Sequence, residues 1–388
     1  MRNRNNYLKI DIKRTPEQIA IARQLGSNNK TESLAAAEAI AAVVSQPLLE
    51  VIQQAPVFSN FYARQTYGPD EAPTIPLTPL FDTKQPGYFL VWSQTMPGGL
   101  ATQQMQGAND LVVQVHSMDG SASLDKKYMR AQQPRINEIS SALTRLANEV
   151  LLKENRDATN VLMGALANSY IDGNSANTAT SNYQIFRSAT AGVFQLDDFN
   201  TIMTKYRRIV PSWVGGTPIG ARAGITDLCG SPEWMGQIRS IAYQPQNTRA
   251  VPNTDESTVL SAPESVREKI FESAGLPNLF NVDLHEFNEL GVNQIYNNVF
   301  ATYATGTYVG NGGVGSATFS STTEQVVVGL NLDWFDLVSL TQTDLAGSEW
   351  ALSADDQFPN RADKIGWWGK LSQGYTSVDN RGKLALIY

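Results

Sequence analysis

The feature that most constrains the fold is a long amphipathic helix predicted directly after Pro134. Apolar residues recur there at steps of three and four, the spacing that places side chains on one face of an α-helix. This stripe comprises Ile136, Ile139, Leu143, Leu146 and Val150, then Ala158, Val161, Leu162, Ala165 and Leu166. Nothing interrupts it before Gly164, so we predict one helix of roughly 30 residues, about 45 Å long.

A helix of this length needs a surface on which to bury its stripe. The mean helix of soluble proteins has about 11 to 12 residues. A coiled-coil dimer is the simplest alternative, but about two regular heptads fall short of the three or four that this interpretation needs. The sequence therefore does not favour a coiled-coil dimer.

Composition narrows the class of protein further. A chain of 388 residues corresponds to about two or three domains, or to one large domain with insertions. Charged residues are 17% and hydrophobic residues 42%, which excludes a charge-rich disordered chain. No run of about 18 apolar residues is present, so we predict no membrane-spanning helix. The basic start leads into no apolar signal core, and we expect an intracellular protein.

The inventory of reactive residues is unfavourable for catalysis. The single cysteine, Cys229, excludes an internal disulfide and a cysteine-based zinc cluster. The two histidines, His116 and His285, lie far apart in sequence and offer little for a multi-histidine metal site or an acid–base relay. We therefore predict that the protein is not an enzyme and has no catalytic, cofactor-binding or metal-binding residues.

Charge is distributed unevenly along the chain. Residues 1–30 hold seven basic and two acidic residues, a net charge of +5, and the whole chain carries −7. The remaining residues therefore carry −12. A basic arm on an acidic body can contact nucleic acid or an acidic patch on another subunit, and it can also be a solvated terminus. These alternatives remain open at this stage.

The first third of the chain alternates helical and extended segments. Thr15-Pro16 is a good helix start, and the helix is predicted to end near Leu25. A second, alanine-rich helix is predicted over about 31–45, with Pro47 opening another apolar turn. Recurrent prolines from Tyr67 to about Lys127 surround strand-like patches at 88–92 and 111–115, which we interpret as a long β-hairpin excursion.

The second half is predicted to be α/β and then mainly β. Helices are predicted from Leu196, with Asp197 or Asp198 as the cap, from Ser231-Pro232 and from Ser261. A stretch ending at Leu228 is a predicted strand. The predicted β features of the last quarter are a buried strand at 326–332 after a glycine-rich insertion at about 305–323, and two strands around a turn, 364–378 and 383–388.

Three short motifs suggest chemistry only weakly. Gly310–Gly315 matches the G-x-G-x-x-G pattern of dinucleotide sites, but the residues after it favour a strand, whereas that motif needs a helix N-terminus. We interpret it as a surface loop or hairpin tip. Ser123 and Lys126 match S-x-x-K without its companion motifs. His285 precedes Glu286 but lacks the second histidine of H-E-x-x-H.

An aromatic pair offers one further candidate surface. Trp367 and Trp368 could stack on nucleic-acid bases. Aromatic pairs inside an apolar strand are more often part of a core or a subunit interface. We favour the core or interface interpretation.

The order of these elements resembles the major capsid proteins of tailed bacteriophages with the HK97-like fold. The phrases that carry the resemblance are Pro134-Arg135-Ile136-Asn137-Glu138-Ile139, Gly230-Ser231-Pro232-Glu233-Trp234 and Val378-Asp379-Asn380-Arg381-Gly382. The resemblance covers most of the chain and rests on layout. It implies an α+β fold with an N-arm, an extended β-hairpin E-loop, a peripheral domain with a long spine helix, and an axial α/β domain.

The implied boundaries follow the chain. They are 1–65 for the N-arm, 66–130 for the E-loop, 131–195 for the peripheral domain, 196–350 for the axial domain with its glycine-rich insertion, and 351–388 for C-terminal strands returning to the peripheral domain. No charge-rich helical leader precedes the arm, so we expect any scaffold to be a separate protein or already removed. Some relatives crosslink through lysine and asparagine, but Lys84, Lys126 and Lys127 align with no such site, and we predict no crosslink.

The resemblance implies a structural subunit of an icosahedral phage head, self-assembling into hexamers and pentamers around double-stranded DNA. Implied partners are further copies of the chain, scaffolding, portal and cement proteins, and DNA held non-specifically on the inner face; no membrane partner and no cofactor are implied. Assembly would take place in the host cytoplasm, and the product is the virion capsid. An encapsulin-type shell is the first alternative, and a soluble enzyme using the Gly310–Gly315 loop is the second.

Overall fold

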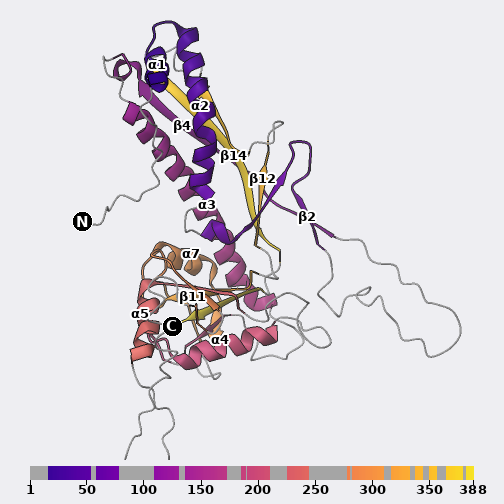
Figure 1. Ribbon diagram of the computed structural model, residues 1–388. Helices are drawn as coiled ribbons and strands as arrows, with labels where there is room; N and C mark the ends of the chain where they lie inside the picture. Colours follow the sequence, from indigo (N-terminus) through magenta and orange to yellow (C-terminus); the bar gives the residue numbers. More distant parts are fainter. Residues whose placement is uncertain are drawn as a thin grey trace, which may run out of the picture. The chain divides into compact units, whose positions relative to one another are not determined.

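A computed structural model gives the fold of the chain and combines helices with antiparallel and mixed sheets (Figure 1). The structure describes residues 16–53, 58–77, 109–130, 136–172, 185–188, 190–209, 225–243, 278–279, 282–309, 316–332, 337–343, 349–355, 364–378 and 382–388. The predicted α+β class is confirmed. The predicted strand at 88–92, the helix from Ser261 and the turn at 379–381 fall outside the described residues.

The chain divides into two compact units, each built from three separate stretches. Unit 1 comprises residues 1–75, 112–158 and 338–376, and unit 2 comprises residues 76–111, 159–337 and 377–388. One division falls inside the long helix, between Ala158 and Thr159. Each unit has its own sheet and its own apolar core.

Unit 1 packs helices on one face of a sheet. The helices are α1 (Pro16–Leu25), α2 (Lys30–Gln53) and α3 (Ile136–Asp172), with short 3₁₀ turns η1 (Phe58–Phe61) and η2 (Lys126–Tyr128). The strands are β1 (Ala63–Tyr67), β4 (His116–Asp125), β12 (Leu337–Gln342), β13 (Ala351–Asp355) and β14 (Lys364–Ser377). The long strand β14 is the centre of this sheet, because it pairs antiparallel with β4 and β13 and adjoins β12.

Helix α3 confirms the predicted long helix and exceeds its predicted length, with 37 residues. The stripe positions Ile139, Leu143 and Leu146 lie in the core of unit 1 together with Trp367 and Leu371 of β14. Gly120 of β4 lies so close to this helix that a Cβ there would stand 2.6 Å from Leu146 Cδ1. The stripe is therefore buried against a sheet of the same chain.

The N-terminal helices complete the same core. Leu25 of α1 and Ala36, Ala37 and Ala41 of α2 are buried there. The Trp367 indole Nε1 donates a hydrogen bond to the Ala37 carbonyl, 3.1 Å away. Helix α2 differs from its prediction, since it continues through Pro47 to Gln53 as one helix. The described part of the N-terminal region is thus packed on unit 1 and is more than an extended arm.

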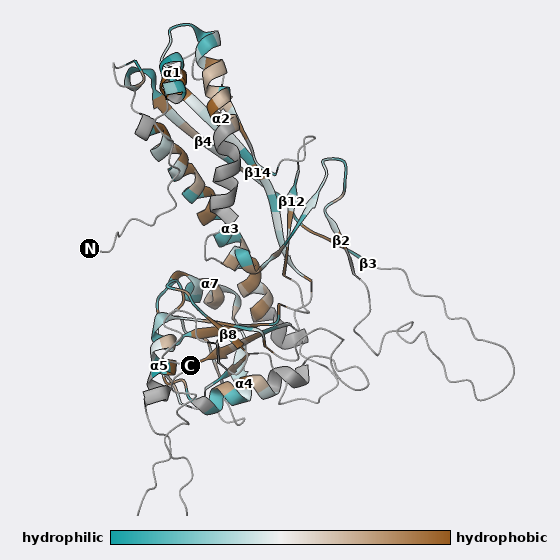
Figure 2. Ribbon diagram, viewed as in Figure 1, coloured by the Kyte–Doolittle hydropathy of each residue, from teal (hydrophilic) through white to brown (hydrophobic). Residues whose placement is uncertain are grey.

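Unit 2 is built on a six-stranded sheet in the order β5-β15-β11-β6-β8-β7. Its strands are β5 (Ile185–Arg187), β6 (Asp227–Gly230), β7 (Asn278–Leu279), β8 (Val282–Glu286), β11 (Val326–Leu330) and β15 (Lys383–Ile387). Every residue of β6, β11 and β15 is buried, and Figure 2 shows brown, apolar strands in this sheet. Continuous apolar runs of this kind mark a sheet covered on both faces.

Helices cover this sheet on its two faces. Helix α4 (Leu196–Ile209) and helix α5 (Pro232–Tyr243) contribute Phe199, Ile202 and Trp234 to a core with Leu284 and Val327. Helix α7 (Ile295–Tyr303) lies on the other side of the sheet from α4 (Figure 1). A two-stranded hairpin, β9 (Thr307–Val309) with β10 (Ser316–Thr318), follows α7. Outside these units' sheets, β2 (Thr74–Leu77) pairs with β3 (Asn109–Val112).

Two helix starts of unit 2 test the capping predictions. The Ser231 hydroxyl accepts a hydrogen bond from the Trp234 backbone N–H at 3.1 Å, which confirms the predicted start of α5. At α4 the cap prediction is wrong in detail. The Asp198 carboxylate accepts from the Gln195 backbone N–H at 3.0 Å, so Asp198 reaches back from the first turn instead of occupying the cap position.

The two C-terminal strands do not form the predicted pair around a turn. Strand β14 lies in unit 1, whereas β15 inserts between β5 and β11 in unit 2. The place of β15 has a simple physical reason. The five residues of β15 are apolar apart from Lys383 and all five are buried, so they need the two-sided cover that the unit 2 sheet provides.

Among the described residues, no helix is both long and apolar enough to span a membrane.

Candidate functional site

The glycine-rich loop at Gly310–Gly315 lies outside the described residues, but the structure describes both of its flanks. Strands β9 and β10 enter and leave the loop and pair antiparallel, with Val309 opposite Ser316. A dinucleotide site needs a helix N-terminus after its glycines, and here a strand follows. The hairpin interpretation is confirmed by the pairing of the two flanks.

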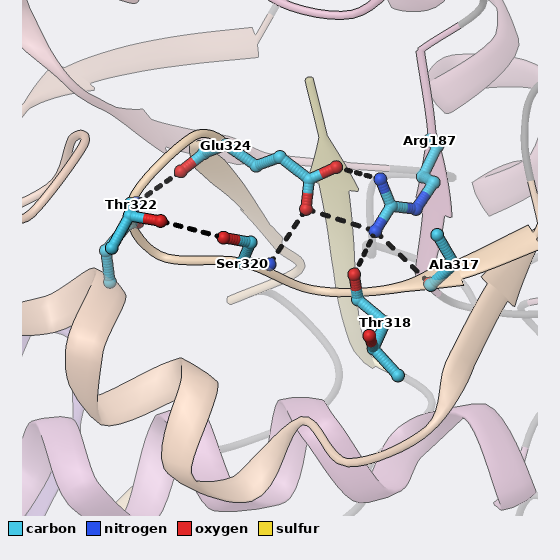
Figure 3. Close-up of polar contacts among 7 residues, drawn as sticks. Arg187, Ala317, Thr318, Ser320, Thr322 and Glu324 are labelled. Atoms are coloured by element: carbon cyan, nitrogen blue, oxygen red, sulfur yellow. Dashed lines mark hydrogen bonds and ion pairs between the residues drawn. The ribbon is translucent and has the colours of Figure 1, made fainter.

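A partly buried arginine connects this hairpin to the sheet of unit 2 (Figure 3). The Arg187 guanidinium of β5 pairs with the Glu324 carboxylate through both Nη atoms. It also donates to the carbonyls of Ala317 and Thr318, at 3.2 and 2.7 Å. The Glu324 carboxylate accepts a further bond from the Ser320 backbone N–H at 2.9 Å. We name Arg187, Glu324 and these three partners the Arg187 clamp.

The environment of His285 does not form a metal site. Its Nε2 lies 2.8 Å from Asp227 Oδ1, and the Thr226 hydroxyl donates to the other oxygen of the same carboxylate. The carboxylate of Glu286 lies 3.7 Å from Arg239 instead. Within the described part of the chain, no group of three or more histidine, cysteine, aspartate or glutamate side chains could hold a metal ion. The pair acts as a cross-strand contact between β6 and β8.

The S-x-x-K residues lie on different local structures. Ser123 is in β4, opposite Gly366 of β14, and Lys126 begins the 3₁₀ turn η2, where it is buried.

Cys229, on β6, is buried. Its burial, and to a smaller extent the charge of Asp227, raises the pKa of its thiol. A thiol with a raised pKa is a poor nucleophile.

The tryptophan pair divides between the two faces of the unit 1 sheet. Trp367 is fully buried in the core, while Trp368 is 40% exposed, because successive side chains of a strand point to opposite faces. Trp368 lies opposite Ser121 on one side and Ser353 on the other. The core interpretation is thus confirmed for Trp367, and Trp368 faces away from the core.

The structure also reveals a polar cluster in unit 1 that the sequence did not indicate. The Arg64 guanidinium of β1 forms an ion pair of 2.6 Å with the Glu349 carboxylate, which lies just before β13. Glu154 of α3 is 97% buried, as its relative exposure is 3%. Tyr62 and Tyr375 adjoin the group, with ring centroids 5.0 Å apart. We name these five residues the Glu154 cluster.

Several polar atoms of this cluster have no hydrogen-bond partner among the described residues. They include Glu154 Oε1 and the Tyr375 hydroxyl. The Tyr62 hydroxyl donates to the Ala158 carbonyl at 2.8 Å, and the neighbouring Asn155 accepts from the Phe58 backbone N–H at 3.1 Å. The cluster therefore combines bonded groups with buried polar atoms that lack a hydrogen bond, and Glu154 is its most deeply buried carboxylate.

Electrostatics single out the same carboxylate. Desolvation by burial raises the pKa of Glu154 from 4.5 to about 7; the charge of Arg64 opposes this shift and that of Glu349 adds to it. Burial likewise raises the pKa values of the Tyr62 and Tyr375 hydroxyls. Because both tyrosines stay neutral, Glu154 is the member of the cluster whose charge changes near neutral pH.

Comparison with solved structures finds capsid and encapsulin chains of low sequence identity. No protein-family model and no curated protein matches the sequence. The capsid of the cyanophage P-SCSP1u matches with a TM-score of 0.47 and 10% identity, over 86% of this chain and 88% of the capsid chain.

Two other solved structures extend the comparison. The capsid of a native GTA particle matches with a TM-score of 0.46 and 8% identity, over 86% and 91% of the two chains. The SrpI encapsulin complex of Synechococcus elongatus matches with a TM-score of 0.37 and 10% identity, over 74% and 77%.

Proposed function

We propose that the protein is the structural subunit of an icosahedral phage head, assembling into hexamers and pentamers that enclose double-stranded DNA. The observation that carries the proposal is the interleaved layout of the chain. Unit 1 and unit 2 are each assembled from three stretches, and one 37-residue helix contributes to both. The HK97-like fold that the sequence resembles implies this order of arm, excursion, long helix, α/β unit and returning strands.

The layout supports a role for each region. Unit 1, with α3 on its sheet, corresponds to the peripheral domain, and unit 2, with its six-stranded sheet, corresponds to the axial domain. Residues 1–65 act as the N-arm and residues 66–130 as the E-loop in this proposal. The described structure modifies that division, because α1, α2 and β4 are packed into unit 1.

The contacts of the candidate motifs and the charge distribution of the chain support assembly over catalysis. Among the described residues, two of the motifs considered for catalysis or binding make structural contacts. His285 contacts Asp227, and the glycine-rich hairpin is bonded through Arg187. Head-to-tail contacts that close by rotation produce rings of identical subunits. An acidic body with a basic N-terminal segment suits a container of DNA, since an acidic wall does not trap the polyanion. Scaffolding, portal and cement proteins are the further partners that this role requires.

Particle size tests the proposal directly. We expect the purified chain, alone or with its scaffold, to sediment as closed shells or as rings of five and six, visible by negative-stain electron microscopy. A uniform monomer or dimer that persists with scaffold present would contradict the proposal. In that case ligand-dependent thermal stabilisation would test the enzyme alternative, because a true ligand stabilises by mass action.

Particle contents separate the phage head from an encapsulin-type shell. We expect nuclease-treated particles to retain double-stranded DNA, measured by their ultraviolet absorbance ratio and by gel electrophoresis after disruption. Particles that hold a cargo protein and no DNA would favour the encapsulin alternative.

The role of the basic N-terminal segment is best tested by a short deletion. Leu25 is part of the unit 1 core, so removing residues 1–30 would damage folding as well as assembly. We expect deletion of residues 1–14 to leave thermal unfolding unchanged and to impair closure of shells. The matched control keeps the length and replaces the five basic residues Arg2, Arg4, Lys9, Lys13 and Arg14 by glutamine. Normal shells from both variants would contradict a role for this segment.

A further inference from the structure

The Glu154 cluster of unit 1 combines a buried carboxylate with an incomplete set of partners. Glu154 comes from α3, Arg64 from β1, and Glu349 from the residues before β13. Arg64 and Glu349 already form an ion pair of 2.6 Å. Glu154 Oε1 and Arg64 Nε are both buried without a hydrogen-bond partner among the described residues. The Arg64–Glu349 pair therefore supplies Glu154 Oε1 with no hydrogen bond.

The charge balance of the cluster depends on one proton. With Glu154 ionised, one guanidinium faces two carboxylates, and the cluster carries a net negative charge away from water. With Glu154 protonated, the charges of Arg64 and Glu349 cancel. A buried charge without its own partner is costly, so the two protonation states differ in how well they fit the closed structure.

The other titratable groups around Glu154 do not remove this imbalance. Tyr62 at the start of β1 and Tyr375 of β14 bring hydroxyls that are neutral at physiological pH. Asp157, one turn along α3, adds a further negative charge near Tyr375, but Lys153 lies 3.1 Å from it. Arg64 is the cation that acts on Glu154, and Glu349 is the anion. The surplus negative charge therefore resides on Glu154.

We propose that Glu154 is a proton-controlled contact that closes α3 on strand β1 when protonated and loosens this contact when ionised. In the closed state the neutral carboxyl group stays buried beside the Arg64–Glu349 pair. In the ionised state the carboxylate draws in water or competes with Glu349 for Arg64. Either response weakens the packing of β1, whose partner strand among the described residues is β12.

The sign of the pH dependence follows from the two protonation equilibria. The pKa of Glu154 is raised from 4.5 to about 7. Between these values the folded chain holds a proton that the unfolded chain has released. Stability therefore falls as pH rises through this window and is constant again above it, for this group alone. Below about pH 4.5 both states are protonated and the group has no effect.

Loosening of β1 affects the segment that follows it. Tyr67, the last residue of β1, accepts hydrogen bonds at its carbonyl from the backbone N–H and hydroxyl of Thr343, at 2.9 and 3.1 Å. The chain then continues into β2. In this way the protonation of Glu154 controls how firmly β1 and the residues that lead into β2 are held in unit 1. This proposal concerns a single chain and stands whether or not the protein forms shells.

Hydrogen exchange measured by mass spectrometry tests the proposal on the full-length chain. We compare the wild type with Glu154→Gln at each pH from 5 to 8, so that intrinsic exchange rates cancel. The amide is neutral at every pH. We expect the two proteins to protect β1 and residues 150–158 equally near pH 5, and the wild type to exchange these amides at least tenfold faster at pH 8. Equal protection at pH 8 would overturn the proposal.

A matched control lies on the same helix. Glu149 is a glutamate of α3 whose side chain is 61% exposed beside Arg145. Glu149→Gln removes the same carboxylate chemistry without touching the cluster, and we expect it to retain the pH-dependent exchange of the wild type. A wild-type-like pH dependence in Glu154→Gln, or its loss in Glu149→Gln, would assign the effect to another group.

Infrared spectroscopy observes the proton itself and needs only the wild type to fold. We expect a carboxylic-acid C=O band that persists well above pH 5 and disappears with a midpoint near the raised pKa of Glu154, about 7. A spectrum in which every carboxyl group has ionised by pH 5.5 would overturn the proposal even if Glu154→Gln did not fold.

Discussion

Each unit of this protein contains a partly buried arginine–glutamate pair, and the two pairs differ in what surrounds them. In unit 2, Arg187 meets Glu324 and two backbone carbonyls, while Glu324 also accepts from a backbone N–H. In unit 1, Arg64 meets Glu349, and a second carboxylate, Glu154, lies nearby without a hydrogen-bond partner of its own among the described residues. The first pair has further backbone partners, and the second has a like charge beside it.

This difference teaches what each pair contributes. Hydrogen bonds that satisfy a buried charge hold it in one geometry over a wide pH range. A cluster with surplus charge responds to pH, because protonation removes the charge that lacks a partner. The Arg187 clamp therefore stabilises a fixed attachment of the β9–β10 hairpin, and the Glu154 cluster provides an attachment that pH adjusts.

The largest expected effect is that of Arg64→Ala. It leaves Glu349 buried without its cation, and at pH 8 it also removes the cation that acts on the ionised Glu154. The pair is partly buried, so we expect a cost between those of exposed and fully buried pairs, about 2–3 kcal/mol. We expect urea unfolding to show a loss of this size at pH 8 and a smaller loss at pH 5, where Glu154 is protonated. An equal loss at both values of pH would contradict the comparison, because it would mean that Arg64 does not act on the ionised Glu154.

Arg187→Ala comes next in size. The substitution removes the donors to Ala317 and Thr318 as well as the pair with Glu324, and we expect a loss of about 2 kcal/mol. We expect this loss to be the same at pH 5 and pH 8, and limited proteolysis to cut the β9–β10 hairpin faster than in the wild type. The control is Arg239→Ala, whose side chain is 57% exposed; it should leave both measurements unchanged.

These two clusters also mark the limit of prediction from the sequence. The periodic stripe after Pro134 predicted α3, and Ser231-Pro232 predicted the start of α5, because both signals are local. Arg187 and Glu324 are 137 residues apart, and no local pattern links them. The three charged members of the Glu154 cluster come from three separate parts of the chain. Contacts of this kind exist only once the sheets have formed.

The pairing of the last two strands shows a related limit of prediction from the sequence. Strand-like residues around a turn correctly indicated strands at 364–378 and 383–388, but strand propensity does not specify a partner. Strand β15 finds β5 and β11, which precede it by about 200 and about 50 residues. The sequence therefore predicted the elements of unit 2 better than the order of its sheet.

A smaller effect, which sharpens the comparison, is expected for Glu349→Gln. Glu349 raises the pKa of Glu154, so its neutralisation lowers that pKa, and Arg64 then has Glu154 as its one ionised partner in the cluster. We expect the net stability at pH 8 to change by no more than about 1 kcal/mol, because relief of repulsion offsets loss of the ion pair. The decline of stability as pH rises from about 5 to 8 should shrink. Unfolding curves across this range measure it, and an unchanged decline would show that the two carboxylates do not interact.

The smallest effect is expected at the exposed pair of α3, where Arg145 and Glu149 lie 2.8 Å apart. Their N–O distance is close to that of the Arg64–Glu349 pair. Water, however, screens their charges, and both side chains keep their mobility. We expect Arg145→Ala to change the free energy of unfolding by less than about 0.5 kcal/mol and to leave its pH dependence intact. A larger or pH-dependent change would mean that position along α3, and not burial, decides which charges matter. The contrast with Arg64→Ala thus isolates desolvation as the cause, since the same helix carries Glu149 on its wet face and Glu154 on its buried face.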